Sequence, residues 1–428
     1  MFRQSALRLL PLCLLAAALP SLPACKSASF KFPGLKKKSE VPAVTEPAPG
    51  ERAAVSRSPE EAAFLAQCAE LAATGTSIAG RDGFFFSPLE LQRLVQLQDP
   101  GSASVRAATA AITDYHNQLK AKGITLILLP IPPKAIVFPD KISKDIKVKV
   151  RRNKVPRFDS TLQTIYANIR NQGVSVMDPT DVLINTREPR KQGPVFTRTA
   201  GVWSPRGAET VAGFLAKELK SAPWANQPGK DGPLITEPTV LSFVGPLVST
   251  SPQPETLPIR NIGRSADGKM RSVTFSQGGN SLALIGDSAL LAWREANNPP
   301  GSSNAFGSLA DQIAFELQTT PDLFPGKPDG RNASRSRLLR EATNGRNPLG
   351  STKVMIWVVQ STDFIFSDWK QIPLKLSFSS AQPPVMLAPP VGLIPDPATG
   401  PRPLPPPSNP PALENDAVQP TGEPELPR

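Results

Sequence analysis

The sequence has few cysteines, a single histidine and no apolar run long enough to cross a bilayer. The run near the start, Leu9 to Leu19, is well short of the roughly 20 residues that a spanning helix needs, and no later stretch reaches that length either. The chain has only three cysteines, and its one histidine is His116. Cysteine and histidine therefore form no cluster with the spacing of a metal site. We expect a chain without a metal, a cofactor or a membrane-spanning helix.

The N-terminus has the order of segments that is typical of an export signal. Basic residues precede the apolar run, and Leu22-Pro23-Ala24-Cys25 follows it. This tetrapeptide resembles the bacterial lipobox, Leu-x-Ala/Gly-Cys, in which the cysteine is acylated and becomes the new N-terminus. The resemblance implies a signal peptide at 1–24 and binding to a membrane through a lipid on Cys25. The alternative is an ordinary cleaved signal in which Cys25 is incidental.

The remaining cysteines and the residue after Cys25 agree with an exported chain. Cys13 would leave with the signal, so that only Cys68 remains and no internal disulfide can form. Cys68 lies on the apolar face of a predicted helix that Ser58 caps, where we expect it to be buried. Lys26 stands where some Gram-negative lipoproteins have an Asp that retains them at the inner membrane. We therefore expect an envelope lipoprotein at the outer membrane, facing the periplasm.

Both ends of the mature chain are predicted to be flexible. Residues 25–57 contain Lys36-Lys37-Lys38 and a run of Pro, Ala, Val and Glu, with too little apolar surface to pack. Residues 377–428 are crowded with proline and have no hydrophobic period, which is typical of disordered or polyproline-like chain. The C-terminal tail is interpreted as solvated, with a role as a partner-binding element or envelope scaffold as the alternative.

The middle, 58–376, is predicted to be one α/β domain with a parallel sheet. Short apolar runs alternate with helical patterns, which is typical of strands covered by helices on both faces. The runs are 124–129, 174–177, 281–285 and 354–359, and the helices are 103–122, 207–220 and 307–318. In such sheets the functional residues gather at the carboxyl ends of the strands. These ends carry Lys134, Asp178, Gly286-Asp287-Ser288 and Gln360-Ser361-Thr362.

Gly286-Asp287-Ser288 is the candidate for chemistry. The segment 281–293 predicts a strand, a tight turn and then a helix, which would place the Ser288 hydroxyl beside backbone N–H groups at the edge of the sheet. Ser288 is thus a candidate nucleophile, and Asp287 is predicted to support the turn. The triplet alone is weak evidence, because Asp and Ser are also common in ordinary turns and caps.

Four segments together resemble a known family. They are Gly80-Arg-Asp-Gly83-Phe-Phe-Phe86, the segment 123–139 with Pro-Pro-Lys134, Leu284-Ile-Gly-Asp-Ser288, and Lys353-Val-Met-Ile-Trp357 through Asp368-Trp369. They resemble the SGNH-hydrolase-like domain of the alginate O-acetylation proteins, the AlgJ/AlgX family. The resemblance implies a circularly permuted SGNH-hydrolase-like sandwich, in which the Asp-x-His element precedes the Gly-Asp-Ser element. It also implies acetyl transfer to a polysaccharide as the family's activity.

The departures from this family concern the charged residues. Its Asp-Thr-His-Trp-Thr-Pro-x-Gly element falls at 200–207, where Ala200 takes the aspartate position and Val202 the histidine position. Val358 and Thr362 stand where the family has a Glu and an Arg. A serine without a base is a poor nucleophile near neutral pH.

Two residues are candidates to replace the missing base. His116 lies in the helix 103–122, before the first predicted strand, and is interpreted as a helix-surface or half-buried histidine. Lys134 is the better candidate by position, as in Ser-Lys variants of the triad. Its family position favours a role in binding or in supporting the loop instead.

The net charge of +12 points to an anionic partner. Basic residues cluster at 147–154 and at 331–346. Nucleic acid is not expected, because no nucleic-acid-binding module is recognisable. An anionic polysaccharide or lipid headgroups fit better, although a solvated basic face without a ligand remains open.

Three functions follow from the sequence. The first is a catalytically impaired relative of the O-acetyltransferases that binds glycan or supports a complex for exopolysaccharide modification or export. The second is an active O-acetyltransferase or esterase that uses Ser288 with a base other than histidine. The third is an envelope scaffold that acts through its Pro-rich tail.

Overall fold

The computed structural model describes residues 56–152, 154–188, 192–227, 232–248, 253–266, 268–294, 305–326 and 330–375. The predicted signal peptide, Cys25, the tether before residue 56 and the Pro-rich tail lie outside these residues. Among the described segments, no helix combines the length and the apolar character that crossing a bilayer requires.

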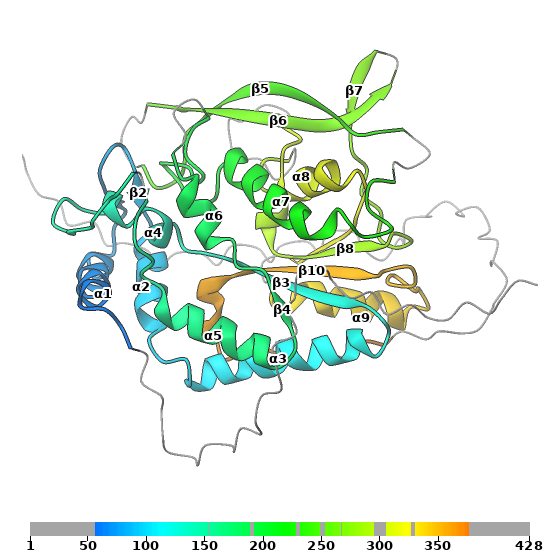
Figure 1. The fold of residues 1–428 in the computed structure, drawn as a ribbon, viewed down its shortest axis with the longest axis horizontal. Helices are drawn as coiled ribbons and strands as arrows, with labels where there is room; N and C mark the ends of the chain where they lie inside the picture. Colours follow the sequence, from blue (N-terminus) through cyan, green and yellow to red (C-terminus); the bar gives the residue numbers. More distant parts are fainter. Residues whose placement is uncertain are drawn as a thin grey trace, which may run out of the picture. The chain divides into compact units, whose positions relative to one another are not determined.

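A five-stranded parallel sheet forms the centre of the fold, as predicted (Figure 1). Its strands lie in the order β4-β3-β10-β8-β9 and all pair in parallel. They are β3 (Thr125–Ile131), β4 (Ser175–Val176), β8 (Leu282–Gly286), β9 (Asp322–Pro325) and β10 (Val354–Gln360). The four predicted runs correspond to β3, β4, β8 and β10.

The strand order shows the circular permutation. If β8 is counted as the first strand and β4 as the last, the sheet has the order 2-1-3-4-5 of flavodoxin-like folds. The chain here begins the sheet with β3 and β4, which would be the fourth and fifth strands. The predicted circularly permuted, SGNH-hydrolase-like α/β fold is therefore confirmed.

Side chains alternate between the two faces of the sheet because successive residues of a strand point in opposite directions. In β10, Ile356 and Val358 face one hydrophobic core, while Met355 and Trp357 face the other. Helices supply the rest of both cores, so both faces are covered and the strands are apolar throughout.

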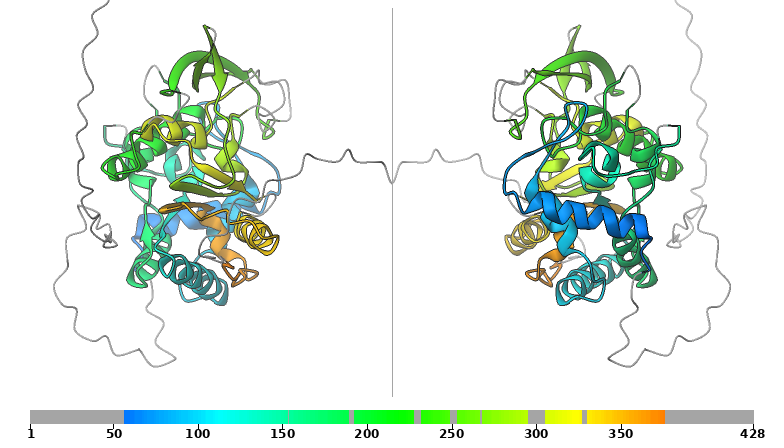
Figure 2. Two further views of the ribbon diagram at one scale, coloured as in Figure 1. Left: turned by 90° about the vertical axis from the view of Figure 1, so that its right-hand side faces the viewer. Right: turned by 90° about the vertical axis from the view of Figure 1, so that its left-hand side faces the viewer.

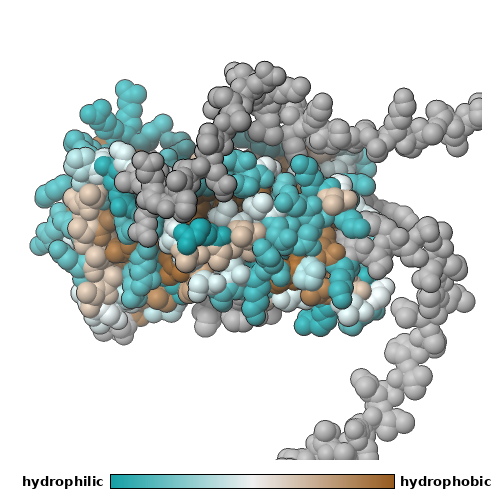
Figure 3. Space-filling model, turned by 90° about the horizontal axis from the view of Figure 1, so that it is seen from below, coloured by the Kyte–Doolittle hydropathy of each residue, from teal (hydrophilic) through white to brown (hydrophobic). Residues whose placement is uncertain are grey.

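The first face is covered by helices from the first half of the domain and by two later ones. These are α1 (Pro59–Ala72), α2 (Pro88–Gln96), α4 (Lys134–Val137), α6 (Thr180–Asn185), α7 (Pro205–Leu219) and α8 (Leu309–Leu317). The other face is covered by α3 (Ala103–Lys120), α5 (Ser160–Asn171) and α9 (Ala333–Thr343). Figure 2 shows both layers from the sides, and Figure 3 shows hydrophilic side chains on much of one face, with apolar patches between them.

Helix starts follow the capping chemistry of the sequence. The hydroxyl of Ser58 accepts from Glu61 N at the start of α1, and that of Ser204 accepts from Gly207 N at the start of α7. Proline occupies the first turn of both helices, where its missing N–H costs nothing. Cys68 is buried in α1 as expected, and burial raises the pKa of its thiol to about 12.

A three-stranded antiparallel sheet lies on the outer side of α7 and α8 (Figure 1) and was not predicted. It consists of β5 (Ile235–Phe243), β6 (Glu255–Ala266) and β7 (Lys269–Ser272), in that order. Most of β5 is exposed apart from Leu241 and Phe243, whereas half of β6 is buried, including Leu257, Ile259 and Ile262. The two-stranded sheet of β1 (Ile78–Ala79) and β2 (Phe85–Phe86) completes the strands of the described residues.

Candidate functional site

A cavity of about 660 Å³ lies at the carboxyl ends of β8 and β10. Ser288 follows β8 and Gln360 ends β10, and both line this cavity. In the flavodoxin-like order these are the neighbouring strands at which the sheet changes direction, which is where open α/β sheets bind their ligands. The topology therefore brings the candidate nucleophile to the expected binding crevice.

Ser288 is exposed in this cavity at the start of a single 3-10 turn, η2 (Ser288–Leu291). Asp287 precedes it, and Asp287 Oδ1 accepts from Ala289 N at 2.8 Å. Gln360 Nε2 donates to Asp287 Oδ2 at 3.2 Å. The carboxylate of Asp287 is therefore engaged in holding the turn against the end of β10.

The predicted helix after Ser288 is wrong, because the chain leaves the 3-10 turn after four residues. Trp293 adopts a positive φ of 71° and is fully buried. Its indole packs edge-on against Phe243, with ring centroids 5.1 Å apart, and donates from Nε1 to the Trp203 carbonyl at 2.8 Å. These long-range contacts of Trp293 outweigh the local preference for a helix.

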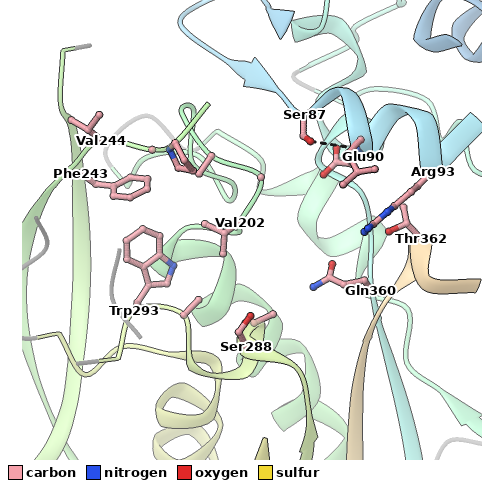
Figure 4. Close-up of a pocket in the computed structure, with 17 residues that line it drawn as sticks. Ser87, Glu90, Arg93, Val202, Phe243, Val244, Ser288, Trp293, Gln360 and Thr362 are labelled. Atoms are coloured by element: carbon pink, nitrogen blue, oxygen red, sulfur yellow. Dashed lines mark hydrogen bonds between the residues drawn. The ribbon is translucent and has the colours of Figure 1, made fainter. Parts of the chain in front are cut away.

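Ala200 and Val202 line the same cavity as Ser288. They belong to a tight loop in which Thr197 N donates to the Val202 carbonyl at 3.1 Å, just before α7 begins. In Figure 4 the Val202 side chain projects into the cavity on the side of Ser288. Methyl groups thus occupy the positions where the family resemblance places the aspartate and histidine of the triad.

Lys134 is fully buried beneath the loop that contains Ala200. Its Nζ donates to the carbonyls of Phe85 at 2.7 Å, Arg198 at 2.9 Å and Ala200 at 3.0 Å. Burial lowers the pKa of Lys134 to about 7, against the opposing attraction of Glu90 and Glu255. Because three carbonyls accept all three ammonium hydrogens, we take Lys134 to be charged in the fold.

The Lys134 amine is thereby placed to support the loop rather than to receive a proton from Ser288. No hydrogen bond links the two side chains, and Lys134 is not among the residues that line the cavity. Among the described residues, no Lys donates to the Ser288 hydroxyl and no Asp or Glu carboxylate accepts from it. His116 lies in α3 near Gly173, at the amino end of β4, far from the carboxyl ends where Ser288 lies.

Helix α2 contributes two charged residues that the sequence did not single out, Glu90 and Arg93. Glu90 Oε1 accepts from Ala135 N at 3.2 Å, and burial raises the pKa of its carboxyl. The Arg93 guanidinium lies 5.0 Å from the centre of the Phe366 ring and has no carboxylate of the described residues within 4 Å. Glu90 follows Ser87 by three residues, so in the sequence it reads as part of a helix cap.

The cavity has two unlike walls (Figure 4). Glu90, Arg93, Gln360 and Thr362 form the polar wall, with Gln360 beside Ser288. The apolar wall is formed by Phe243, Val244 and Trp293. In the part of the chain that the structure describes, no group of three or more His, Cys, Asp or Glu side chains is arranged to hold a metal ion.

Comparisons with known proteins agree on one family. The family model described as SGNH hydrolase-like domain, acetyltransferase AlgX, matches residues 78–292, which is half of the chain. A probable alginate O-acetylase AlgJ of Pseudomonas aeruginosa is 29% identical over 154 residues, which cover 36% of each chain. The AlgJ protein of Pseudomonas putida, described in the same words, is 25% identical over 221 residues, covering 49% of this chain and 54% of that one. The chain thus spans a third to a half of the length of these relatives.

Two solved structures are similar at low sequence identity. The O-acetyltransferase domain of Pseudomonas putida AlgJ covers 72% of this chain and 96% of its own, with 20% identity and a TM-score of 0.47. Pseudomonas aeruginosa AlgX covers 74% of this chain and 70% of its own, with 17% identity and a TM-score of 0.48.

Proposed function

Since the chain belongs to the AlgX family of SGNH hydrolase-like acetyltransferase domains, we propose that it is a catalytically impaired member that binds a polysaccharide in the family's cleft. One observation carries the proposal. Ser288 lies in the cavity together with Ala200 and Val202, and neither of these side chains can accept a proton.

Loss of the base is expected to abolish most of the acyl-transfer rate. A serine hydroxyl needs a neighbour that takes its proton, and the triad's histidine and aspartate act as a unit. Removing members of a triad leaves a residual rate of roughly 10³ to 10⁴ over water, from the remaining donors and binding contacts. Binding does not depend on these residues, so a cleft can persist after catalysis is lost.

The walls of the cavity support binding of a sugar chain. Sugar rings present hydroxyls at their edges and C–H groups on their faces. The donors and acceptors of Glu90, Arg93 and Gln360 suit the hydroxyls, and the apolar wall suits the C–H faces. The relatives are alginate O-acetylases by name. We therefore propose an anionic polysaccharide as the ligand, with Arg93 as the residue that binds its negative charge.

A fluorophosphonate probe tests whether Ser288 is reactive. We expect no stoichiometric labelling of the full chain, and the same background in Ser288→Ala. Stoichiometric labelling that disappears in Ser288→Ala would overturn the proposal.

Restoring the base gives a complementary test. The double variant Ala200→Asp with Val202→His should gain hydrolysis of p-nitrophenyl acetate, and Ser288→Ala in the same background should remove it. Thermal unfolding of the double variant controls for misfolding, because Ala200 is buried and a larger, charged side chain there could disturb the packing.

Titration calorimetry with alginate oligosaccharides tests the binding. We expect Arg93→Gln to weaken binding by about tenfold, the typical effect of one charge-assisted hydrogen bond. Arg106→Gln, an exposed arginine in α3, serves as the matched control. Equal affinity of Arg93→Gln and the unaltered chain would refute the assignment of Arg93.

A working O-acetyltransferase or esterase is the second candidate, and Glu90 is the observation in its favour. Its carboxyl lines the cavity and has a raised pKa, as a general base needs. Figure 4 shows it on the wall opposite Ser288, so that a proton would have to pass through a water or the substrate. Probe labelling that survives in Lys134→Met but disappears in Glu90→Gln would establish this second function.

The cellular setting is also proposed. Cleavage after residue 24, a lipid on Cys25, a tether to residue 57 and the Pro-rich tail would hold the domain at the outer membrane, within an exopolysaccharide modification or export complex. Mass spectrometry of the N-terminal peptide from the native chain tests the lipid on Cys25. An unmodified Cys25 would contradict it.

A further inference from the structure

A second cavity, of about 380 Å³, lies between the start of α1 and the loop that follows η1 (Pro139–Lys141). Ser58 and Glu60 line it on the side of α1. Lys147, Lys149, Arg151, Lys154 and Arg157 line it on the side of the loop. We call these residues the basic cleft.

The loop is shaped as a short hairpin. Arg151 and Lys154 exchange backbone hydrogen bonds of 2.9 Å in both directions, and Arg152 has a positive φ of 50°. The basic side chains of the loop, Lys147, Lys149, Arg151, Arg152 and Lys154, are all exposed. Val150 lies among them with 44% of its surface exposed, as one of the few large apolar side chains that the described residues leave in solvent.

Most of this charge is not neutralised within the described residues. Arg157 is the exception, since it pairs with Asp159 at 2.6 Å, Asp178 at 2.7 Å and Asp181 at 3.3 Å. Lys149 has one exposed partner, Glu60, at 3.4 Å. No described carboxylate lies within 4 Å of Lys147, Arg151 or Lys154. These three cations line the cavity and are free to bind an anion.

The other basic run of the sequence, at 331–346, is different. Arg331 pairs with Asp368 at 2.7 Å, Arg346 pairs with Glu341 at 2.7 Å, and Arg335 is buried against the Trp357 ring. Those arginines stabilise the fold. Lys147, Arg151 and Lys154 of the basic cleft, by contrast, have no carboxylate partner among the described residues.

We propose that the basic cleft docks the domain on a membrane surface by binding anionic lipid headgroups. The occupant follows from where the cleft lies. Its wall includes Ser58, about 30 residues after Cys25, so that a chain acylated on Cys25, as proposed above, would keep this cleft within the length of the tether from the bilayer. Each lysine or arginine near an anionic membrane adds to the attraction, and an exposed valine among them fits the headgroup layer.

A sugar polymer is the less suitable partner for this cleft. Its only aromatic wall residue is Phe158, which is buried and stacks on Phe64, with ring centroids 4.8 Å apart. The docking surface is separate from the Ser288 cavity, and the proposal does not depend on the function of that cavity.

Vesicle co-sedimentation tests the proposal. The full chain with Cys25→Ser, which cannot be acylated, is mixed with vesicles of phosphatidylglycerol and phosphatidylcholine, or of phosphatidylcholine alone. We expect binding only to the anionic vesicles, and weaker binding at higher salt. Replacing Lys147, Arg151 and Lys154 by Glu should reduce the affinity by about tenfold or more.

The matched control replaces three other exposed cations, Lys217, Arg340 and Lys353, by Glu, which changes the net charge equally. Retention of vesicle binding by this control supports a defined surface. Equal loss in both variants, or no binding by the parent chain, would overturn the proposal. Binding to soluble alginate through the same three cations, without binding to vesicles, would also overturn it and assign the cleft to polysaccharide. Circular dichroism checks that both variants are folded.

Discussion

At the scale of single residues, His116 is a sensitive probe of stability. It is the only histidine in the sequence, so its titration cannot be confused with that of another imidazole. His116 is 7% exposed, and burial first and Lys120 second lower its pKa below the ordinary value. The sequence-based interpretation as a surface or half-buried residue underestimated this burial. Its neighbour is Gly173 in the loop before β4, a contact that sequence spacing does not reveal.

The lowered pKa of His116 predicts a loss of stability on mild acidification. In the unfolded chain the imidazole has a pKa of about 6.5. As the pH falls through this value, the unfolded chain takes up a proton that the folded chain does not, so the free energy of unfolding decreases. Urea unfolding at pH values from 7.5 to about 5.5 should show this decrease in the parent chain and a weaker one in His116→Gln. Identical slopes in both would contradict it.

At the scale of elements, the Ser288 turn depends on close packing between β8 and β10. A Cβ added to Gly286 would lie 2.8 Å from the Val358 carbonyl oxygen and 3.0 Å from Leu290 Cδ1. Both neighbours belong to the sheet or to the turn itself, so neither can move freely. The valine at 358, where the family resemblance places a Glu, contributes to this contact with its own Cβ at 3.0 Å.

Gly286→Ala is therefore expected to lower the free energy of unfolding by about 1–3 kcal/mol, as overpacked cores do. Gly213→Ala is the matched control, because nothing lies within 4 Å of its added Cβ in α7. That change should stabilise the chain by about 0.5–1 kcal/mol, since alanine favours the helix. Chemical denaturation measures the free energy of unfolding of both variants. If Gly286→Ala left the free energy of unfolding unchanged, the turn would tolerate a wider separation of β8 from β10.

At the scale of the whole molecule, the last described residues pack back against α3 and the core. Gln118 of α3 donates from Nε2 to the Ile372 carbonyl at 3.3 Å and accepts from Leu374 N. Trp369 is buried against Trp357, with ring centroids 5.8 Å apart. This C-terminal segment therefore packs into the core of the described fold.

Truncation after residue 376 is expected to leave the midpoint of thermal unfolding unchanged. Truncation after residue 368 removes Trp369 and Ile372 from the core and should cost about 3–5 kcal/mol or more, the range for loss of a large buried side chain. Calorimetry of the two truncated chains compares them. Destabilisation by the first truncation would mean that the Pro-rich tail contributes to the stability of the domain.

The amino-acid sequence by itself determined the elements that local chemistry controls. Continuous apolar runs bury both faces of a strand, so β3, β8 and β10 were predictable from short windows. The capping hydroxyl of Ser58 fixed the start of α1, whereas α7 begins at Pro205, two residues before the predicted start. The identities of Ala200 and Val202 also needed no structure, because they follow from the residues that stand in the family's motif.

Only the tertiary structure decided what surrounds Ser288. Glu90 and Arg93 reach the cavity from a helix about 200 residues earlier in the chain, and the burial of Trp293 ends the turn after Ser288. The same folding distinguishes the two basic runs, since Arg331 and Arg346 of one meet Asp368 and Glu341, while Lys147, Arg151 and Lys154 of the other meet no described carboxylate. Such outcomes depend on packing between distant segments, which no local pattern encodes, because each contact exists only once the whole sheet and its helices have assembled.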